Sequence, residues 1–183
     1  MRLFIGIDLP GEIKQTLLEF QSELRHHGVD GQWKSEENFH ITLEFLGELD
    51  HNALPIITET LSKGVSNHTR FRLNIGGLGA FPSFKRPHTL WTGVGGCLNE
   101  LSLLRDEIHF ELAKNSFVLE DRKFNPHITM ASRPKLEDID LSVFLTKKLG
   151  EFIVGEVVLF ESRAIGGKRT YMNLFSTSLY HQF

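Results

Sequence analysis

A six-residue motif occurs twice in this chain and constrains its fold more than any other feature. The first copy, NFHITL, occupies residues 38–43, and the second, NPHITM, occupies residues 125–130, 87 positions later. In both copies polar and apolar residues alternate with the two-residue period of a β-strand, so the histidine and the threonine project from one face. A fold that places the two strands side by side would bring two imidazoles and two hydroxyls into one cleft, which suits acid-base chemistry on a phosphoryl group.

The repeat extends beyond the motif itself. At the same 87-residue offset, matching or similar residues pair up as Leu3 with Leu90, Phe4 with Trp91, Gly6 with Gly93, Ile7 with Val94 and Leu17 with Leu104. The order strand, helix, motif strand, helix, strand also recurs. We therefore predict one two-lobed domain over residues 1–183, with repeat halves at about 1–76 and 89–163 and a C-terminal strand at 170–180. Two such lobes related by a pseudo-twofold axis would bring equivalent strands together.

Hydrophobic periodicity predicts the individual elements. Helical spacing of apolar residues predicts helices at 11–27, 54–65 and 98–112, with a weaker one within 137–148. Apolar or alternating runs predict strands at 2–8, 39–46, 71–75, 89–94, 125–131, 152–160 and 171–179. Residues 76–87 are rich in glycine, proline and phenylalanine, and we interpret them as a loop that crosses between the lobes.

The composition excludes several classes of protein. A chain of 183 residues with 40% hydrophobic content can bury one substantial core or two small lobes that share an interface. Its single cysteine, Cys97, excludes an intrachain disulfide framework. Asp8 and Pro10 come too early for a signal peptide, and no apolar run reaches membrane-spanning length, so we expect a cytoplasmic protein. A net charge of -3 argues against general coating of nucleic acid but allows a local basic patch.

With these motifs in their context, the sequence resembles the bacterial and archaeal RNA 2',3'-cyclic phosphodiesterases, formerly called 2'-5' RNA ligases, of the two-histidine phosphoesterase superfamily. The resemblance covers nearly the whole chain and is carried by residues 2–10, Trp33, 40–47, 77–82, 90–91, 124–130, Gly167 and Tyr171. It implies a bilobal α+β fold in which antiparallel sheets flank a central cleft and helices pack on the outer faces. It also implies a monomer that needs no metal and no other cofactor.

The same resemblance implies the chemistry. His40 would be the acid that protonates the departing 3'-oxygen, and His127 the base that activates water, so that a 2'-phosphate end results. Thr42 and Thr129 would donate hydrogen bonds to the non-bridging oxygens, where charge accumulates. The substrate would be RNA with a 2',3'-cyclic phosphate end, such as a tRNA fragment, or a nucleoside 2',3'-cyclic phosphate. The reverse reaction would join RNA through a 2'-5' linkage.

Substrate-binding residues are less sharply defined. The family often has an arginine five residues after the second histidine, where this chain has Ser132 and then Arg133. Because a one-residue shift on a strand reverses the face, Arg133 would replace that arginine only where the strand ends or bulges. A base could stack on one of the aromatic residues Trp33, Phe81, Phe84 and Phe124. The RNA backbone could bind loop cations among Arg86, Arg122, Lys123, Arg133, Lys168 and Arg169.

Three alternatives stay open on the sequence. The same site could act on another small cyclic phosphate, a cyclic dinucleotide or an acyl phosphodiester, or the chain could be a non-catalytic RNA-binding module. A lone histidine on a strand is usually a surface residue or a satisfied core residue, so only the pairing favours catalysis. A metal hydrolase is disfavoured, because neither motif has a second ligand at suitable spacing and only Glu44 adds a carboxylate on the histidine face.

Overall fold

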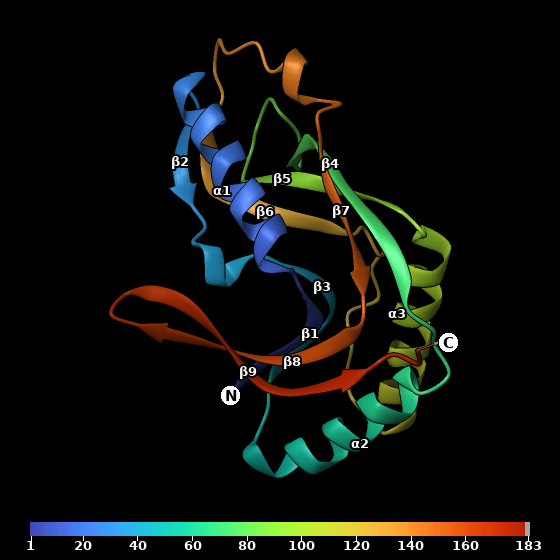
Figure 1. Ribbon diagram of the computed structural model, residues 1–183. Coiled ribbons are helices and arrows are strands. Elements are labelled where there is room, and N and C mark those ends of the chain that lie inside the picture. The colour runs from blue at the N-terminus through green and yellow to red at the C-terminus, as the bar shows by residue number, and fades with distance from the viewer. Residues whose placement is uncertain (182–183) are drawn as a thin grey trace.

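The computed structural model describes residues 1–181, which form two antiparallel sheets with three α-helices packed around them (Figure 1). The helices are α1 (Gly11–His26), α2 (Leu54–Val65) and α3 (Leu98–Lys114). The strands are β1 (Arg2–Asp8), β2 (Asp30–Trp33), β3 (His40–Glu48), β4 (Phe71–Phe81), β5 (Thr89–Gly96), β6 (His127–Lys135), β7 (Lys148–Val154), β8 (Glu156–Ile165) and β9 (Lys168–Ser178). None of the described helices is long and apolar enough to cross a membrane.

The sequence repeat is a repeat of topology. One sheet has the strand order β3-β1-β8-β9, and the other has the order β2-β6-β5-β4-β7. At the 87-residue offset, β1 corresponds to β5, α1 to α3, β3 to β6 and β4 to β8. Each half therefore gives two strands to one sheet and its third strand to the other sheet. This exchange joins the two sheets into one pseudo-twofold structure, and the α+β class with antiparallel sheets is confirmed.

Both motif strands carry a bulge at the same place. In β3 the register with β1 skips Leu43, and in β6 the register with β5 skips Met130, the equivalent residue. Each bulge follows directly after the motif threonine and ends the alternation of exposed and buried residues. Two consecutive residues are consequently buried in each strand, Leu43 with Glu44 and Met130 with Ala131. The repeated bulge turns the carboxylate of Glu44 into the protein.

One large hydrophobic core holds the two sheets and the helices together, and a small separate cluster consists of Phe4, Val158 and Phe160. Helix α1 buries Ile13, Leu17, Phe20 and Leu24, and helix α3 buries Leu101, Leu104, Ile108 and Leu112, as their helical spacing predicts. Buried residues from both sheets belong to the same cluster. Strands β3 and β6 approach each other, so the packing of the core places the two motifs side by side.

Two predicted elements are wrong. The glycine-rich segment at 76–87 is a loop only in its second part, because β4 continues to Phe81. Its glycines make room for an aromatic ring: a Cβ atom on Gly79 would lie 2.2 Å from the Trp91 side chain. The helix predicted within 137–148 is reduced to a 3-10 turn at Ser142–Phe144, and β7 then begins at Lys148 to pair with β4.

Three further strands, β2, β7 and β8, were not predicted as they occur. The apolar run at 152–160 divides at Gly155 into β7 and β8, which belong to different sheets. Strand β2 is absent from the prediction because its four residues carry no apolar alternation. It pairs with the edge of β6, next to the second motif.

Candidate active site

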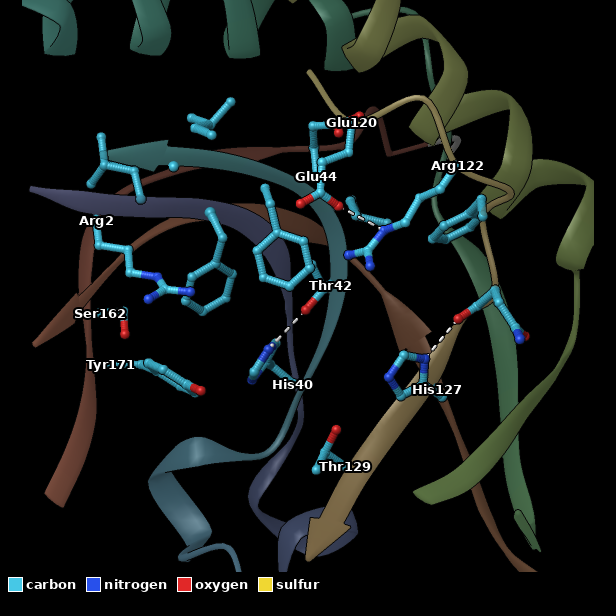
Figure 2. Close-up of a pocket in the computed structure, with 18 of the residues that line it drawn as sticks. Arg2, His40, Thr42, Glu44, Glu120, Arg122, His127, Thr129, Ser162 and Tyr171 are labelled. Atoms are coloured by element: carbon cyan, nitrogen blue, oxygen red, sulfur yellow. Dashed lines mark hydrogen bonds and ion pairs between the residues drawn. The ribbon is translucent and has the colours of Figure 1, made fainter. Parts of the chain in front are cut away.

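The two motif histidines line one cleft of about 870 Å³ between the sheets (Figure 2). His40 comes from the start of β3 and His127 from the start of β6, and Thr42 and Thr129 line the same cleft. Figure 2 shows the two imidazoles on neighbouring walls, with both threonine side chains beside them. The structure therefore brings together the four residues that the repeated motif singles out.

Both imidazoles are oriented in the same way. Nδ1 of His40 lies 2.8 Å from the carbonyl oxygen of Asn38, and Nδ1 of His127 lies 2.7 Å from the carbonyl oxygen of Asn125. A carbonyl oxygen only accepts, so each Nδ1 carries the hydrogen and each Nε2 is left as the reactive nitrogen. Nε2 of His40 lies 3.0 Å from the Thr42 hydroxyl, which donates to it while the ring is neutral.

Burial disfavours the charged form of both rings. Desolvation lowers the pKa of His40 from 6.5 to about 4, and the charge of His127 acts in the same direction, while the bond to Asn38 opposes it. Desolvation also lowers the pKa of His127, helped by the charge of Arg122. In the free protein both histidines are therefore neutral at pH 7.

This burial predicts a loss of stability in acid. The unfolded chain takes up a proton on His40 below its ordinary pKa of 6.5, whereas the folded protein does so only near 4, so stability falls as the pH drops between these values. The full difference corresponds to about 3 kcal/mol. Urea unfolding at about pH 7 and about pH 4.5 should show a larger loss for the wild type than for His40→Gln. If the wild type and His40→Gln lost the same free energy of unfolding between these pH values, desolvation of the His40 ring would be contradicted.

Aromatic rings surround each histidine. The His40 ring lies 4.8 Å from Phe4 and 5.0 Å from Tyr171, measured between centroids. The His127 ring lies 4.9 Å from Phe81 and 6.1 Å from Trp91. Phe4 and Trp91 are equivalent in the repeat, so the same position in each half supplies an aromatic neighbour. These rings limit the water around the imidazoles and fix their orientation.

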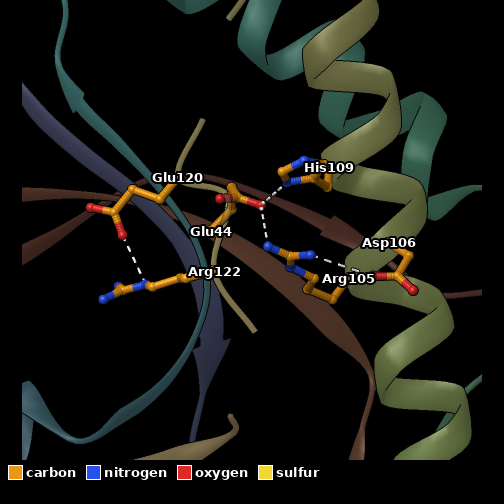
Figure 3. Close-up of polar contacts among 6 residues, drawn as sticks. All are labelled: Glu44, Arg105, Asp106, His109, Glu120 and Arg122. Carbon is orange, nitrogen blue, oxygen red and sulfur yellow. Dashed lines mark hydrogen bonds and ion pairs between the residues drawn. The ribbon is translucent and has the colours of Figure 1, made fainter. Parts of the chain in front are cut away.

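A buried carboxylate organises the wall formed by α3 (Figure 3). Glu44 is 4% exposed, and its Oε2 atom lies 2.7 Å from Nδ1 of His109 and 3.3 Å from Nη2 of Arg105. The Arg105 guanidinium lies 5.7 Å from the centroid of the Phe124 ring, which faces the cleft. The bulge after Thr42 thus turns the Glu44 carboxylate inward, where it holds Arg105 against the cleft wall.

The other predicted residues divide into two groups. Phe81, Phe124, Arg122, Lys123 and Arg169 line the cleft with the motif residues. The remaining candidates do not line it: Trp33, Phe84, Arg86, Arg133 and Lys168.

Arg133 and Trp33 have clear reasons to lie elsewhere. The bulge in β6 falls at Met130, before Ser132, so Ser132 lines the cleft and Arg133 is exposed with a positive φ of 48°. Trp33 packs against the core, and the Arg25 guanidinium lies 5.0 Å from the centroid of its ring.

Several cleft residues were missed as site candidates: Arg2, Phe4, Lys34, Arg105 and Tyr171. Arg2, Phe4 and Arg105 lie in segments that the sequence identifies only as an ordinary strand or helix. Lys34 follows the unpredicted strand β2. The repeat offers one signal, because Phe4 corresponds to Trp91 beside the second motif.

Comparison with known proteins shows the family to which the chain belongs. The sequence profile of the LigT-like phosphoesterases matches residues 7–91. The RNA 2',3'-cyclic phosphodiesterase of Aeropyrum pernix is 37% identical over 141 residues, which cover 77% of this chain and 79% of that protein. The chain belongs to the LigT-like phosphoesterase family. The RNA 2',3'-cyclic phosphodiesterase of Thermotoga maritima, another relative, is 38% identical over 71% of this chain and 68% of its own length.

Solved structures share the LigT-like fold. A Thermus thermophilus protein matches with a TM-score of 0.81 and 25% identity over the full length of both chains. Escherichia coli LigT in complex with 3'-AMP matches with a TM-score of 0.78 and 23% identity over 97% of both chains. The two-sheet architecture of this chain is therefore that of the LigT-like phosphoesterases.

Proposed function

We propose that this protein hydrolyses the 2',3'-cyclic phosphate at the end of an RNA chain to a 2'-phosphomonoester, without a metal ion and with His40 and His127 as acid and base. The observation that carries the proposal is the matched anchoring of the two rings. Each Nδ1 is tied to the carbonyl oxygen two residues earlier, and both side chains line one cleft. The names of the Aeropyrum and Thermotoga relatives support the substrate class.

The reaction needs one proton removed and one supplied. Nε2 of His127 takes a proton from water as the water oxygen bonds to phosphorus. The bond between phosphorus and the ribose 3'-oxygen breaks, and Nε2 of His40 gives its proton to that oxygen. Each acid or base role contributes about 10²- to 10⁴-fold to the rate. The two nitrogens then exchange protons with solvent before the next turnover.

Binding of the substrate phosphate favours the protonated form of His40, which the ring needs to act as an acid. Its pKa of about 4 keeps the free ring neutral near pH 7, but a phosphate anion bound beside the ring favours the imidazolium. Once Nε2 carries a proton, it no longer accepts from Thr42. The Thr42 hydroxyl is then free to donate to a non-bridging phosphate oxygen, as Thr129 does from the opposite motif.

Turnover in the presence of EDTA tests this function. An RNA oligomer with a 2',3'-cyclic phosphate end and a nucleoside 2',3'-cyclic phosphate should both yield monoesters at rates that EDTA does not change. Product formation is followed by chromatography, with the same RNA ending in a 3'-hydroxyl as the unreactive control. Binding of the RNA without any product would instead identify a non-catalytic RNA-binding module. Turnover of the nucleoside substrate alone would point to a small cyclic phosphate as the substrate.

A further inference from the structure

Some of the positively charged side chains that line the cleft form ion pairs with carboxylates, and others do not. On the wall beside His127, Arg105 lies 3.3 Å from Glu44 and 3.4 Å from Asp106, and Arg122 lies 2.8 Å from Glu120. The charges of these two arginines are therefore largely balanced by carboxylates. Lys123 is the one cation of this wall with no carboxylate within 4 Å among residues 1–181.

Three further cations line the cleft: Arg2, Lys34 and Arg169. None of them has a carboxylate within 4 Å in the described chain, and Figure 2 shows Arg2 beyond His40, on the side away from His127. Burial lowers the pKa of Lys34, and the positive charge of Arg169 lowers it further. The charge of Lys34 also acts on His40, whereas Arg122 is the cation that acts on His127. Positive side chains that line one cleft without carboxylate partners favour an anion between them.

Buried amides hold Lys34 and Arg169 in place. The Nε2 atom of Gln21, which is 1% exposed, donates to the carbonyl oxygen of Lys34 at 2.9 Å and to that of Met130 at 3.0 Å. The Lys34 backbone N–H also donates to Met130, at 2.9 Å. The end of β2 is thereby fixed to the second motif strand.

Arg169 is fixed in a similar way. The side-chain amide of Asn38 donates to the Arg169 carbonyl oxygen at 2.8 Å, and the Arg169 guanidinium donates to Ser162 at 3.2 Å. Figure 2 shows Ser162 and Tyr171 beyond His40, on the side away from His127. Arg169 therefore lies beyond the acid histidine rather than between the two imidazoles, whereas the backbone of Lys34 is tied to β6.

We propose that Lys34 and Arg169 form a second anion subsite, which binds the phosphodiester that precedes the cyclic-phosphate nucleotide. This inference rests on the proposed function, in which the reacting phosphate lies between the two histidines and the departing ribose oxygen faces His40. The RNA chain leaves that ribose through its 5'-oxygen, so its next phosphate follows on the His40 side. A cleft of about 870 Å³ has room for more than one nucleotide. The subsite makes the enzyme prefer an RNA chain to a single nucleotide.

Substrate preference tests the subsite. We compare kcat/KM for a dinucleotide and for a mononucleoside, both ending in a 2',3'-cyclic phosphate, in the wild type, Lys34→Met and Arg169→Met. Each variant should lower the ratio of dinucleotide to mononucleoside kcat/KM by about tenfold, the size of one charged phosphate contact. Lys34→Arg should restore most of the ratio. Lys85→Met, an exposed lysine outside the cleft, is the matched control.

The outcomes separate this inference from the proposed function. If Lys34→Met lowered kcat/KM equally for both substrates, Lys34 would act at the reacting phosphate and the second subsite would be overturned. Wild-type kcat/KM for both substrates in both variants would also overturn it. A wild type that turns over neither substrate would reject the proposed function itself. The salt dependence of KM for the dinucleotide gives an independent measurement, since losing one phosphate contact lowers its logarithmic slope by about one.

Discussion

Replacing either motif histidine with alanine is expected to lower kcat for a cyclic-phosphate-ended RNA by about 10²- to 10⁴-fold. Each substitution removes an imidazole whose Nδ1 is bonded to a backbone carbonyl and whose Nε2 is left as the reactive nitrogen. Within residues 1–181, no other histidine lines this cleft. The loss should appear in kcat more than in KM, because the proton transfers occur in the transition state. Single-turnover rates measured with saturating enzyme give the comparison.

The control for this experiment is His26→Ala. His26 is exposed at the end of α1 and lies outside the cleft. It should retain wild-type activity. Circular dichroism and urea unfolding show whether the His40 and His127 variants stay folded. A folded variant of either residue that keeps near wild-type kcat would remove that histidine from the reaction.

Glu44→Ala is expected to destabilise the protein by about 3–5 kcal/mol, the usual effect of removing one partner from a buried ion pair. The Arg105 side chain is 13% exposed and would lose its buried carboxylate, and His109 would lose a hydrogen bond of 2.7 Å (Figure 3). For a chain of this length, the change corresponds to a fall of about 10 °C in Tm.

Urea unfolding with an unchanged m-value measures this effect. Glu48→Ala is the matched control from the same strand, because its side chain is 76% exposed and it should cost less than about 0.5 kcal/mol. Glu44→Gln keeps the volume of the side chain and one acceptor, so its loss should fall between those of the two alanine variants. If Glu44→Ala were as stable as Glu48→Ala, the cluster around Arg105 would have no structural role.

The parts of the fold that the sequence predicts well are those with one-sided burial. Helices α1 and α3 each bury a single stripe, and the motif strands bury every second residue up to the bulge, so their periods are visible in the sequence. The 87-residue repeat adds the order of these elements. Together the periods and the repeat are sufficient to assign the histidines and threonines of the motif to one cleft.

The errors come from residues whose role depends on distant contacts. Gly79 indicates a loop by composition, but it belongs to a strand because the Trp91 ring occupies the space of its missing side chain. The run at 152–160 is apolar throughout, so nothing in its pattern marks Gly155 as the point where the chain passes from one sheet to the other. Lys34 reaches the cleft only through the pairing of β2 with β6.

The phosphate position in the product tests the paired-histidine account most directly. An RNA ending in a 2',3'-cyclic phosphate is treated with the wild-type protein, and the products are separated by chromatography that resolves 2'- from 3'-phosphate ends. With His40 protonating the 3'-oxygen and His127 activating water, all of the product carries a 2'-phosphate, and neither histidine variant forms it at a comparable rate. A 3'-phosphate, or a mixture of the two isomers, would contradict the account.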